Sequence, residues 1–184
     1  MTKIFNSLIL LLITVPVMAE ATRPNIVWVF SDDHTQKAIG AYGSILKSVN
    51  PTPNLDRLAK EGMLFERSYV ANSICAPSRA TLLTGKHSHL NGKVDNMGGF
   101  NHDQEQFQKI LQRNGYQTAM IGKIHLAGKM QGFDYWEVLP GQGSYYNPDF
   151  ITEEGKTSYT GYVADIVTEK SIDWLENKRD KEKP

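Results

Sequence analysis

The sequence predicts an α/β fold in which a mainly parallel β-sheet is flanked by helices on both faces. Strand-like and helix-like segments alternate along the chain, which is typical of this class. The first strand-like segment is apolar on both sides, as the strands of a covered parallel sheet are. Charged residues follow two of the strands directly, and in such sheets ligands bind beyond the carboxyl ends of strands.

The N-terminal half is predicted to hold two strands and one helix. Residues 25–30 form a near-continuous β-branched and aromatic run, which predicts a strand buried on both faces. A helix follows Thr52, with Pro53 in its first turn, and ends at Gly62. Residues 63–70 are predicted to form the second strand.

The C-terminal half is predicted to add two helices and a short strand. Residues 103–114 carry apolar side chains at helical spacing and are followed by Gly115, which ends the helix. Residues 116–121 are predicted as a strand and residues 161–178 as the last helix. The charged residues 176–184 have the composition of a surface connection. A helix and a polar loop with no further strand form an unfinished unit, so we expect the N-terminal portion of a larger fold.

Composition excludes several classes of protein. The chain has 20 basic and 20 acidic residues, so its formal net charge is zero. This balance gives no electrostatic footprint for nucleic acid and argues against a disordered, highly charged chain. The single cysteine, Cys75, excludes an intrachain disulfide and a Cys-rich zinc module.

The first 19 residues are predicted to be a signal peptide. Lys3 gives a positive start, residues 8–17 form an apolar run, and the chain offers cleavage after Ala19 or after Ala21. The run is far shorter than the ~20 apolar residues of a membrane helix, so no stable membrane span is expected. The mature protein would be exported, either periplasmic or secreted, with residues 24–184 as its folded part.

Residues 133–150 are rich in aromatic side chains, interleaved with glycine, asparagine and proline. The rings belong to Phe133, Tyr135, Trp136, Tyr145, Tyr146 and Phe150. The segment is predicted to be a loop with exposed rings, which could stack on the faces of sugars. Rings that cover the core are the alternative.

The most informative stretch is residues 75–85, Cys-Ala-Pro-Ser-Arg-Ala-Thr-Leu-Leu-Thr-Gly. It places Cys75 just before the N-terminus of a predicted helix, with Pro77 in the first turn and Gly85 at the end. Free N–H groups at such an end favour anions. Arg79, one turn in, is a forked cation suited to a tetrahedral oxyanion. On the residues alone, a buried inert cysteine beside a solvated arginine is the alternative.

The pattern Cys-x-Pro-Ser-Arg, followed by Leu-Thr-Gly, resembles the signature of the type I, formylglycine-dependent sulfatases. Three more blocks resemble the same family in the same order. Residues 25–33 end in a pair of aspartates, residues 51–59 resemble the helix that follows, and residues 115–125 end in Gly-Lys-Ile-His. Tyr-Tyr-Asn at residues 145–147 is similar to a segment of N-acetylglucosamine-6-sulfatases.

The resemblance implies an alkaline-phosphatase-like α/β fold and a sulfuric ester hydrolase that acts on a sulfated glycan such as a glycosaminoglycan. A maturation enzyme would oxidise Cys75 to Cα-formylglycine, whose hydrate has two hydroxyls. One would attack sulfur and release the alcohol, and the other would help to expel sulfate. Asp32, Asp33 and the oxygen at residue 75 would be ligands of Ca²⁺, a hard ion that takes oxygen donors.

The resemblance also assigns roles to three further residues. Arg79 would stabilise the ionised hydrate, Lys123 would bind the sulfate, and His125 would exchange a proton with the hydrate. Ile124 stands where the family usually has an aromatic residue, most often Trp, so we expect altered packing with the chemistry retained.

Family members are well over twice as long as this chain, and their other metal ligands come from the later half. The chain by itself would therefore hold half a metal shell and be inactive alone. Two alternatives stay open: a phosphoester or phosphonate hydrolase of the same superfamily, and a non-catalytic glycan-binding module.

Overall fold

The computed structural model describes residues 23–49 and 51–184, so the predicted signal peptide lies outside the described residues. Its sheet has four strands in the order β1-β2-β3-β4. They are β1 (Ala119–Lys123), β2 (Tyr135–Leu139), β3 (Asp149–Thr152) and β4 (Gly155–Ser158). β1 and β2 are parallel, whereas β2–β3 and β3–β4 are antiparallel. The described sheet is therefore mixed, whereas the sequence predicts a mainly parallel sheet.

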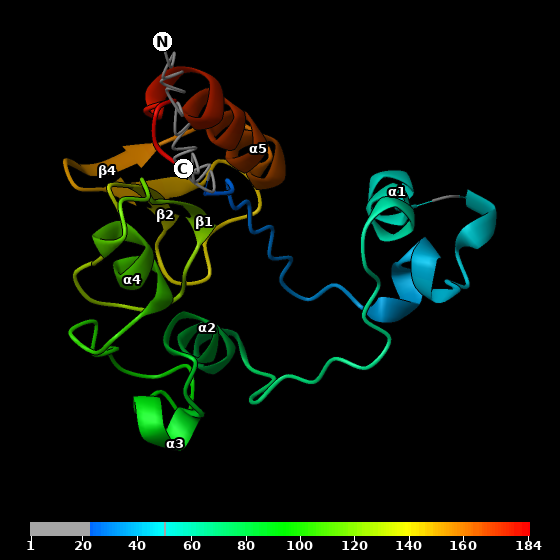
Figure 1. Ribbon diagram of the computed structural model, residues 1–184, viewed down its shortest axis with the longest axis horizontal. Helices are drawn as coiled ribbons and strands as arrows, with labels where there is room; N and C mark the ends of the chain where they lie inside the picture. The colour runs from blue at the N-terminus through cyan, green and yellow to red at the C-terminus, as the bar shows by residue number, and fades with distance from the viewer. Residues whose placement is uncertain (1–22, 50) are drawn as a thin grey trace, which may run out of the picture.

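Helices cover both faces of this sheet, as the sequence predicts (Figure 1). The helices are α1 (Pro53–Glu61), α2 (Cys75–Thr84), α3 (Ser88–Asn91), α4 (Phe107–Arg113) and α5 (Val163–Asp173), the last continuing as a π-helical turn over Trp174–Lys178. α2 and α4 pack on one face of the sheet and α5 on the other. Short 3₁₀ turns span Gln36–Ala38, Gly40–Tyr42 and Lys47–Val49. No helix in residues 23–49 and 51–184 has the length and apolar character needed to cross a membrane.

Two small cores lie on opposite faces of the sheet because successive strand residues point to opposite sides. On β2, Val138 packs with α2 in the first core, and its neighbour Leu139 packs with α5 in the second. On β3, Ile151 and Phe150 divide in the same way. The first core contains Ala76, Ala80, Leu83, Phe100, Ile124, Leu126 and Val138. The N-terminus of α2 and the end of β1 are thus anchored in one packed cluster.

The prediction that residues 25–30 form a buried strand is wrong for the structure described here. The segment is extended but unpaired, and Val27 and Val29 are exposed. Trp28 stacks on Phe107 with ring centroids 5.5 Å apart, so contacts come from one side. A strand needs a neighbour about 4.8 Å away, and here a cavity separates the segment from β1.

The second predicted strand, residues 63–70, is also not formed. It runs as an exposed connection between α1 and α2, with Met63, Phe65 and Tyr69 open to solvent. Apolar, β-branched residues favour strands only where a partner edge accepts their backbone hydrogen bonds. No described strand lies along this connection.

α1 and the 3₁₀ turns form a lobe joined to the sheet by two extended stretches (Figure 1). The Asp56 carboxylate of α1 accepts the Ala41 N–H at 2.7 Å, and the Thr52 hydroxyl accepts the Gly40 N–H at 2.8 Å. A Cβ at Gly40 would lie 2.1 Å from the Asp56 carboxylate, so only glycine permits this approach. Tyr42 donates its hydroxyl to the Phe65 carbonyl at 2.9 Å, which closes the lobe.

The other predicted elements are present with shifted bounds. The helix predicted for residues 103–114 is α4, which begins only at Phe107, and the strand predicted for residues 116–121 is β1. The predicted last helix corresponds to α5 and its π-helical turn. Residues 133–150 are not simply a loop, because they contain β2 and the start of β3. Phe150 is fully buried there, whereas Tyr145 and Tyr146 are exposed.

Candidate active site

α2 begins at Cys75, which the sequence places just before the helix, and its first turns pack into the core. Ala76 and Ala80 have no exposed surface, so the helix is held close to the sheet. Gly85 ends it in the left-handed region at φ 65°. Cys75 itself is partly exposed and free. The sole cysteine therefore lies at a fixed helix N-terminus and remains accessible.

β1 delivers a second part of the site at its carboxyl end. The strand ends at Lys123, Ile124 is buried in the first core, and His125 follows at φ 51°. A left-handed conformation is uncommon for a residue other than glycine and costs of order 1 kcal/mol or more. Ile124 is the residue for which altered packing is expected, and here it packs in the core. This packing anchors the backbone at the point where the chain changes direction at His125.

The Lys123 ammonium is the centre of the site. It lies 2.6 Å from the Asp32 carboxylate and 3.6 Å from Cys75 Sγ. It also donates to Gln142 Oε1 at 2.5 Å. Its side chain is only 12% exposed, so these contacts form in a largely desolvated place where charge interactions are strong. Three separate segments of the chain meet at one cation.

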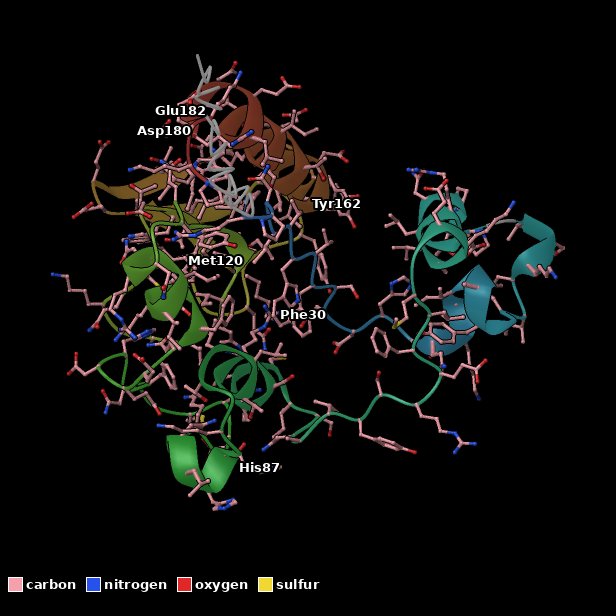
Figure 2. All side chains as sticks on the ribbon, viewed as in Figure 1. Phe30, His87, Met120, Tyr162, Asp180 and Glu182 are labelled. Atoms are coloured by element: carbon pink, nitrogen blue, oxygen red, sulfur yellow. The ribbon has the colours of Figure 1, made fainter. Side chains whose placement is uncertain are left out.

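Arg79 connects α2 to the same carboxylate. Its guanidinium is 3.2 Å from Asp32 Oδ1 and donates to the Lys123 carbonyl at 2.5 Å. The guanidinium also lies 4.8 Å from the ring centroid of Phe30, which Figure 2 shows on the extended N-terminal segment. Arg79 is buried, contrary to the solvated arginine of the alternative interpretation.

Two cations therefore share the Asp32 carboxylate. Partial burial alone would raise the pKa of Asp32, but hydrogen bonds and charge from Lys123 and Arg79 outweigh it, so this pKa lies below its ordinary value. Asp32 is ionised at neutral pH and neutralises part of the positive charge. Asp33, its neighbour, is exposed and makes no hydrogen bond within the described residues.

His125 stands in a positive environment. Burial is the largest cause that lowers its pKa, and the charges of Lys123, Arg79 and Lys93 lower it further, against a smaller opposing effect of Asp32. Its Nδ1 is buried and has no hydrogen-bond partner among the described residues. The imidazole is therefore neutral at pH 7 and has a ring nitrogen free to accept or donate.

The donor chemistry at residues 32 and 33 fits a hard cation in part. Two adjacent carboxylates at one chain turn suit Ca²⁺, which takes six to eight oxygen ligands. The Cys75 thiol is a soft donor that suits Ca²⁺ poorly, so residue 75 fits only once it carries oxygen. Among the described residues, no group of three or more His, Cys, Asp or Glu side chains is arranged to hold a metal. The described chain thus offers part of a calcium shell.

Sequence reasoning missed Gln142, which contacts Lys123 directly. It lies three residues after the end of β2, the strand that pairs in parallel with β1. The carboxyl ends of parallel neighbours meet at one edge of a sheet, so the residue after β2 belongs to the same site as Lys123. The available signal was the strand itself, which the sequence analysis interpreted as a loop.

A cavity of about 980 Å³ adjoins the site. Asp32, Asp33, Lys123 and Gln142 line one part of it, while its other walls are mainly apolar and include Trp28 and Met120. Cys75 and His125 do not line it. The cavity is therefore largely the gap between residues 25–30 and the sheet, and only its polar end belongs to the site.

These features define an α/β protein with buried cationic side chains at the carboxyl edge of its parallel strands and a candidate nucleophile at a helix N-terminus. The family model for sulfatases matches residues 24–184. The chain belongs to the sulfatase family, and the predicted α/β fold of that family is confirmed.

Relatives agree over most of the chain. An N-acetylglucosamine-6-O-sulfatase of Bacteroides thetaiotaomicron is 51% identical over 172 residues, which cover 92% of this chain and 30% of that protein. Arylsulfatase G of Rattus norvegicus is 40% identical over 131 residues, covering 65% of this chain and 24% of the relative. The chain thus spans less than a third of the length of either relative.

A solved structure shows the same arrangement of the backbone. It is a complex of a protein with its substrate D-glucosamine-2-N,6-O-disulfate, 51% identical to this chain, with a TM-score of 0.84. The match covers 89% of this chain and 33% of the solved one.

Proposed function

We propose that the protein is an exported sulfuric ester hydrolase that removes sulfate from a sulfated glycan, with 6-O-sulfated glucosamine as its substrate. The observation that carries the proposal is the convergence on Lys123. Its ammonium meets Cys75 Sγ from α2 and the Asp32 carboxylate from the N-terminal segment. A nucleophile precursor and a metal-binding carboxylate thus both lie in contact with one sulfate-binding cation.

Two groups added to the chain complete this site in the proposal. A Cα-formylglycine, made from Cys75 by a maturation enzyme, supplies a hydrated aldehyde as nucleophile and a route to release sulfate without attack by water on an ester of the enzyme. Asp32 and Asp33 would hold a Ca²⁺ ion, which would supply Lewis-acid polarisation of the sulfate. The buried, orphaned Nδ1 of His125 and the unpaired carboxylate of Asp33 agree with a site that such groups complete.

In this mechanism Lys123 binds the sulfate group, and Arg79 stabilises the ionised hydrate at residue 75. Both cations are nearly buried and point at the same carboxylate, so their positions are fixed before a substrate arrives. Cations held in advance in a desolvated site stabilise developing negative charge without reorganising at the moment of reaction. Gln142, held on Lys123, limits the directions in which that ammonium can donate.

His125 takes and returns the proton at the nucleophile. Its lowered pKa keeps the ring neutral at pH 7, and Nδ1 has no competing partner in the described residues. A positioned proton-transfer group of this kind contributes about 10²- to 10⁴-fold in rate.

The substrate class rests on the relatives and on two exposed rings. The relative from Bacteroides thetaiotaomicron is named for N-acetylglucosamine 6-O-sulfate, and the solved neighbour binds a glucosamine disulfate. Tyr145 lines the cavity beside Gln142, and Tyr146 packs on Tyr162 with centroids 5.2 Å apart. Tyr145 and Tyr146 are largely exposed, as residues that stack on a sugar face must be.

The mass of the tryptic peptide Ser68 to Arg79 tests the nucleophile. In full-length protein made with its own maturation machinery, we expect an aldehyde oxygen to replace the thiol and one hydrogen of residue 75. An unmodified thiol in every preparation contradicts the proposal.

Hydrolysis of matched sulfate and phosphate esters of one alcohol tests the reaction. We expect the sulfate ester to have the higher kcat/KM. Preference for the phosphate ester would assign a phosphoester hydrolase, and calorimetric binding of a sulfated glycan without turnover would assign a binding module.

A further inference from the structure

The helix that begins at Cys75 lacks a cap from its own sequence. Ile74 occupies the N-cap position and has no side-chain acceptor, and no local side chain caps the first turn. The first N–H groups of a helix have no intrahelical partner and are normally satisfied by a neighbouring Ser, Thr, Asp or Asn. At a candidate nucleophile, an uncapped first turn would leave residue 75 loosely placed.

Asn96 supplies the cap from 20 residues further along the chain. Its Oδ1 accepts the Ala76 N–H at 3.0 Å, directly after Cys75. Asn72 fixes the other side of the turn, since its Oδ1 accepts the Ile74 N–H at 3.2 Å and its amide donates to the Ser88 hydroxyl at 3.1 Å. Both neighbours of Cys75 are thus hydrogen-bonded to asparagine side chains.

A buried lysine holds the loop that presents Asn96. Lys93 is only 2% exposed, and its ammonium donates to the carbonyls of Met97 at 2.7 Å and Gly98 at 2.9 Å, with Gly99 at 3.4 Å. A buried ammonium is costly unless its donors are paired. Here the three carbonyls satisfy it and fold the loop back on itself, with Asn96 immediately before them.

We propose that Asn96, presented by the loop that Lys93 holds, is a positioning residue for the nucleophile at residue 75. The inference rests on the proposed sulfatase function. Asn96 acts through the Ala76 N–H: it fixes the first turn of α2, and with it the direction of the residue 75 side chain toward Lys123. Displacement of a reacting group by about 1 Å can cost on the order of 10²-fold in rate, so a cap at this place affects kcat.

The test uses full-length protein in which conversion of residue 75 has been measured by mass, so that rates refer to converted molecules. We expect Asn96→Ala to lower kcat about tenfold with KM within about twofold. Asn96→Asp retains an acceptor at the same place and is expected to recover most of kcat. Asn101→Ala is the matched control, because Asn101 is exposed and caps only the local Asp103 N–H at 2.9 Å.

Lys93→Met provides an independent second variant. It keeps the length of the lysine's aliphatic stem and removes the ammonium, and we expect the same fall in kcat. The effects of substitutions at residues that act through the same contact do not add. The double variant should therefore have a kcat little lower than that of the more impaired single variant. Additive losses would contradict the link between Lys93 and Asn96.

Other outcomes overturn the inference. A rise in KM with unchanged kcat would mean that Asn96 touches the substrate, and an equal loss in Asn101→Ala would mean a general effect on the loop. If the wild type hydrolyses no sulfate ester, the proposed function fails by itself. The positioning role is then tested by alkylation of the unconverted Cys75, which we expect to be faster in Asn96→Ala than in Asn101→Ala, and equal rates overturn it.

Discussion

The two halves of the site are held in very different ways. Cys75, Arg79 and Lys123 lie on α2 and β1, which pack together through Ala76, Ala80 and Ile124 in the first core. Asp32 and Asp33 lie on an exposed, extended segment that reaches the sheet mainly through Trp28, Phe30 and the two ion pairs of Asp32.

The comparison shows which part of the chemistry is preorganised by the chain described here. Residue 75 and the cations of Arg79 and Lys123 are fixed by buried contacts, whereas the carboxylates of Asp32 and Asp33, the proposed metal ligands, lie on an exposed segment and depend on a few contacts and on charge. Variants on the packed side should therefore change kcat, and variants on the extended side should change metal affinity first.

Loss of the side chain at residue 75 tests the packed half and has the largest expected effect. Cys75→Ala removes the nucleophile precursor, so we expect kcat to fall by about 10⁴-fold or more. Thermal unfolding should change little, because Cys75 is partly exposed and outside the first core. Activity within tenfold of wild type would contradict the assignment of residue 75.

The carboxylates of the extended half come next. We expect Asp32→Asn and Asp33→Asn each to lower kcat/KM by about 10²- to 10³-fold at low Ca²⁺. This loss corresponds to the several kcal/mol by which a bound metal stabilises a transition state. Excess Ca²⁺ should rescue Asp33→Asn better than Asp32→Asn, because Asp32 also pairs with Lys123 and Arg79. Activity after chelation of Ca²⁺ that equals that of the untreated enzyme would contradict a metal at these residues.

The pH dependence of kcat/KM tests the assignment of proton transfer to His125. Because burial and nearby cations lower the pKa of His125, the acid limb of kcat/KM should have its midpoint below the ordinary value of 6.5 and fall about tenfold per pH unit beneath it. Added salt should move that midpoint only slightly, since burial is the largest cause. A midpoint above 6.5 contradicts the assignment of the proton to His125.

The lowered pKa of His125 also makes the free energy of unfolding depend on pH. The folded protein protonates His125 at lower pH than the unfolded chain does. The stability that the neutral ring contributes is therefore present above pH 6.5 and is lost as the pH falls from there through the lowered pKa. Chemical denaturation at pH 7 and pH 5 should show this loss in the wild type and a smaller one in His125→Gln.

The sequence predicted the packed half well, since its signals are local. Cys75 at a helix start, Gly85 at its end and Lys123 at a strand end follow from residue types and spacing over a few positions. The cap that Asn96 makes and the contact of Gln142 with Lys123 were missed because they join residues 20 and 19 positions apart. No local pattern marks an asparagine that caps a distant helix. The family resemblance supplied the roles of these residues, and spacing alone did not.

The extended half was predicted less well for a physical reason. Residues 25–30 have the composition of a doubly buried strand, but composition states only what a strand could bury and not which strand will pair with it. In the described structure the segment lies across a cavity from β1, and Val27 and Val29 remain exposed. Exposed apolar side chains gathered on one segment are typical of a surface that another part of a protein covers.

The smallest expected effect tests whether residues 25–30 are packed on one side only, as in the described structure, or buried on both faces, as their composition predicts. Phe30 lies under the Arg79 guanidinium, while Val29, its neighbour, is 86% exposed. We expect Phe30→Ala to weaken apparent Ca²⁺ affinity about two- to fivefold, the size of one exposed cation–π contact, and Val29→Ala to leave it unchanged. A Ca²⁺ titration of activity measures both. Equal losses in the two variants would mean that residues 25–30 are buried on both faces in the working enzyme, as their composition predicts, and that the one-sided packing seen here is completed by a further partner strand.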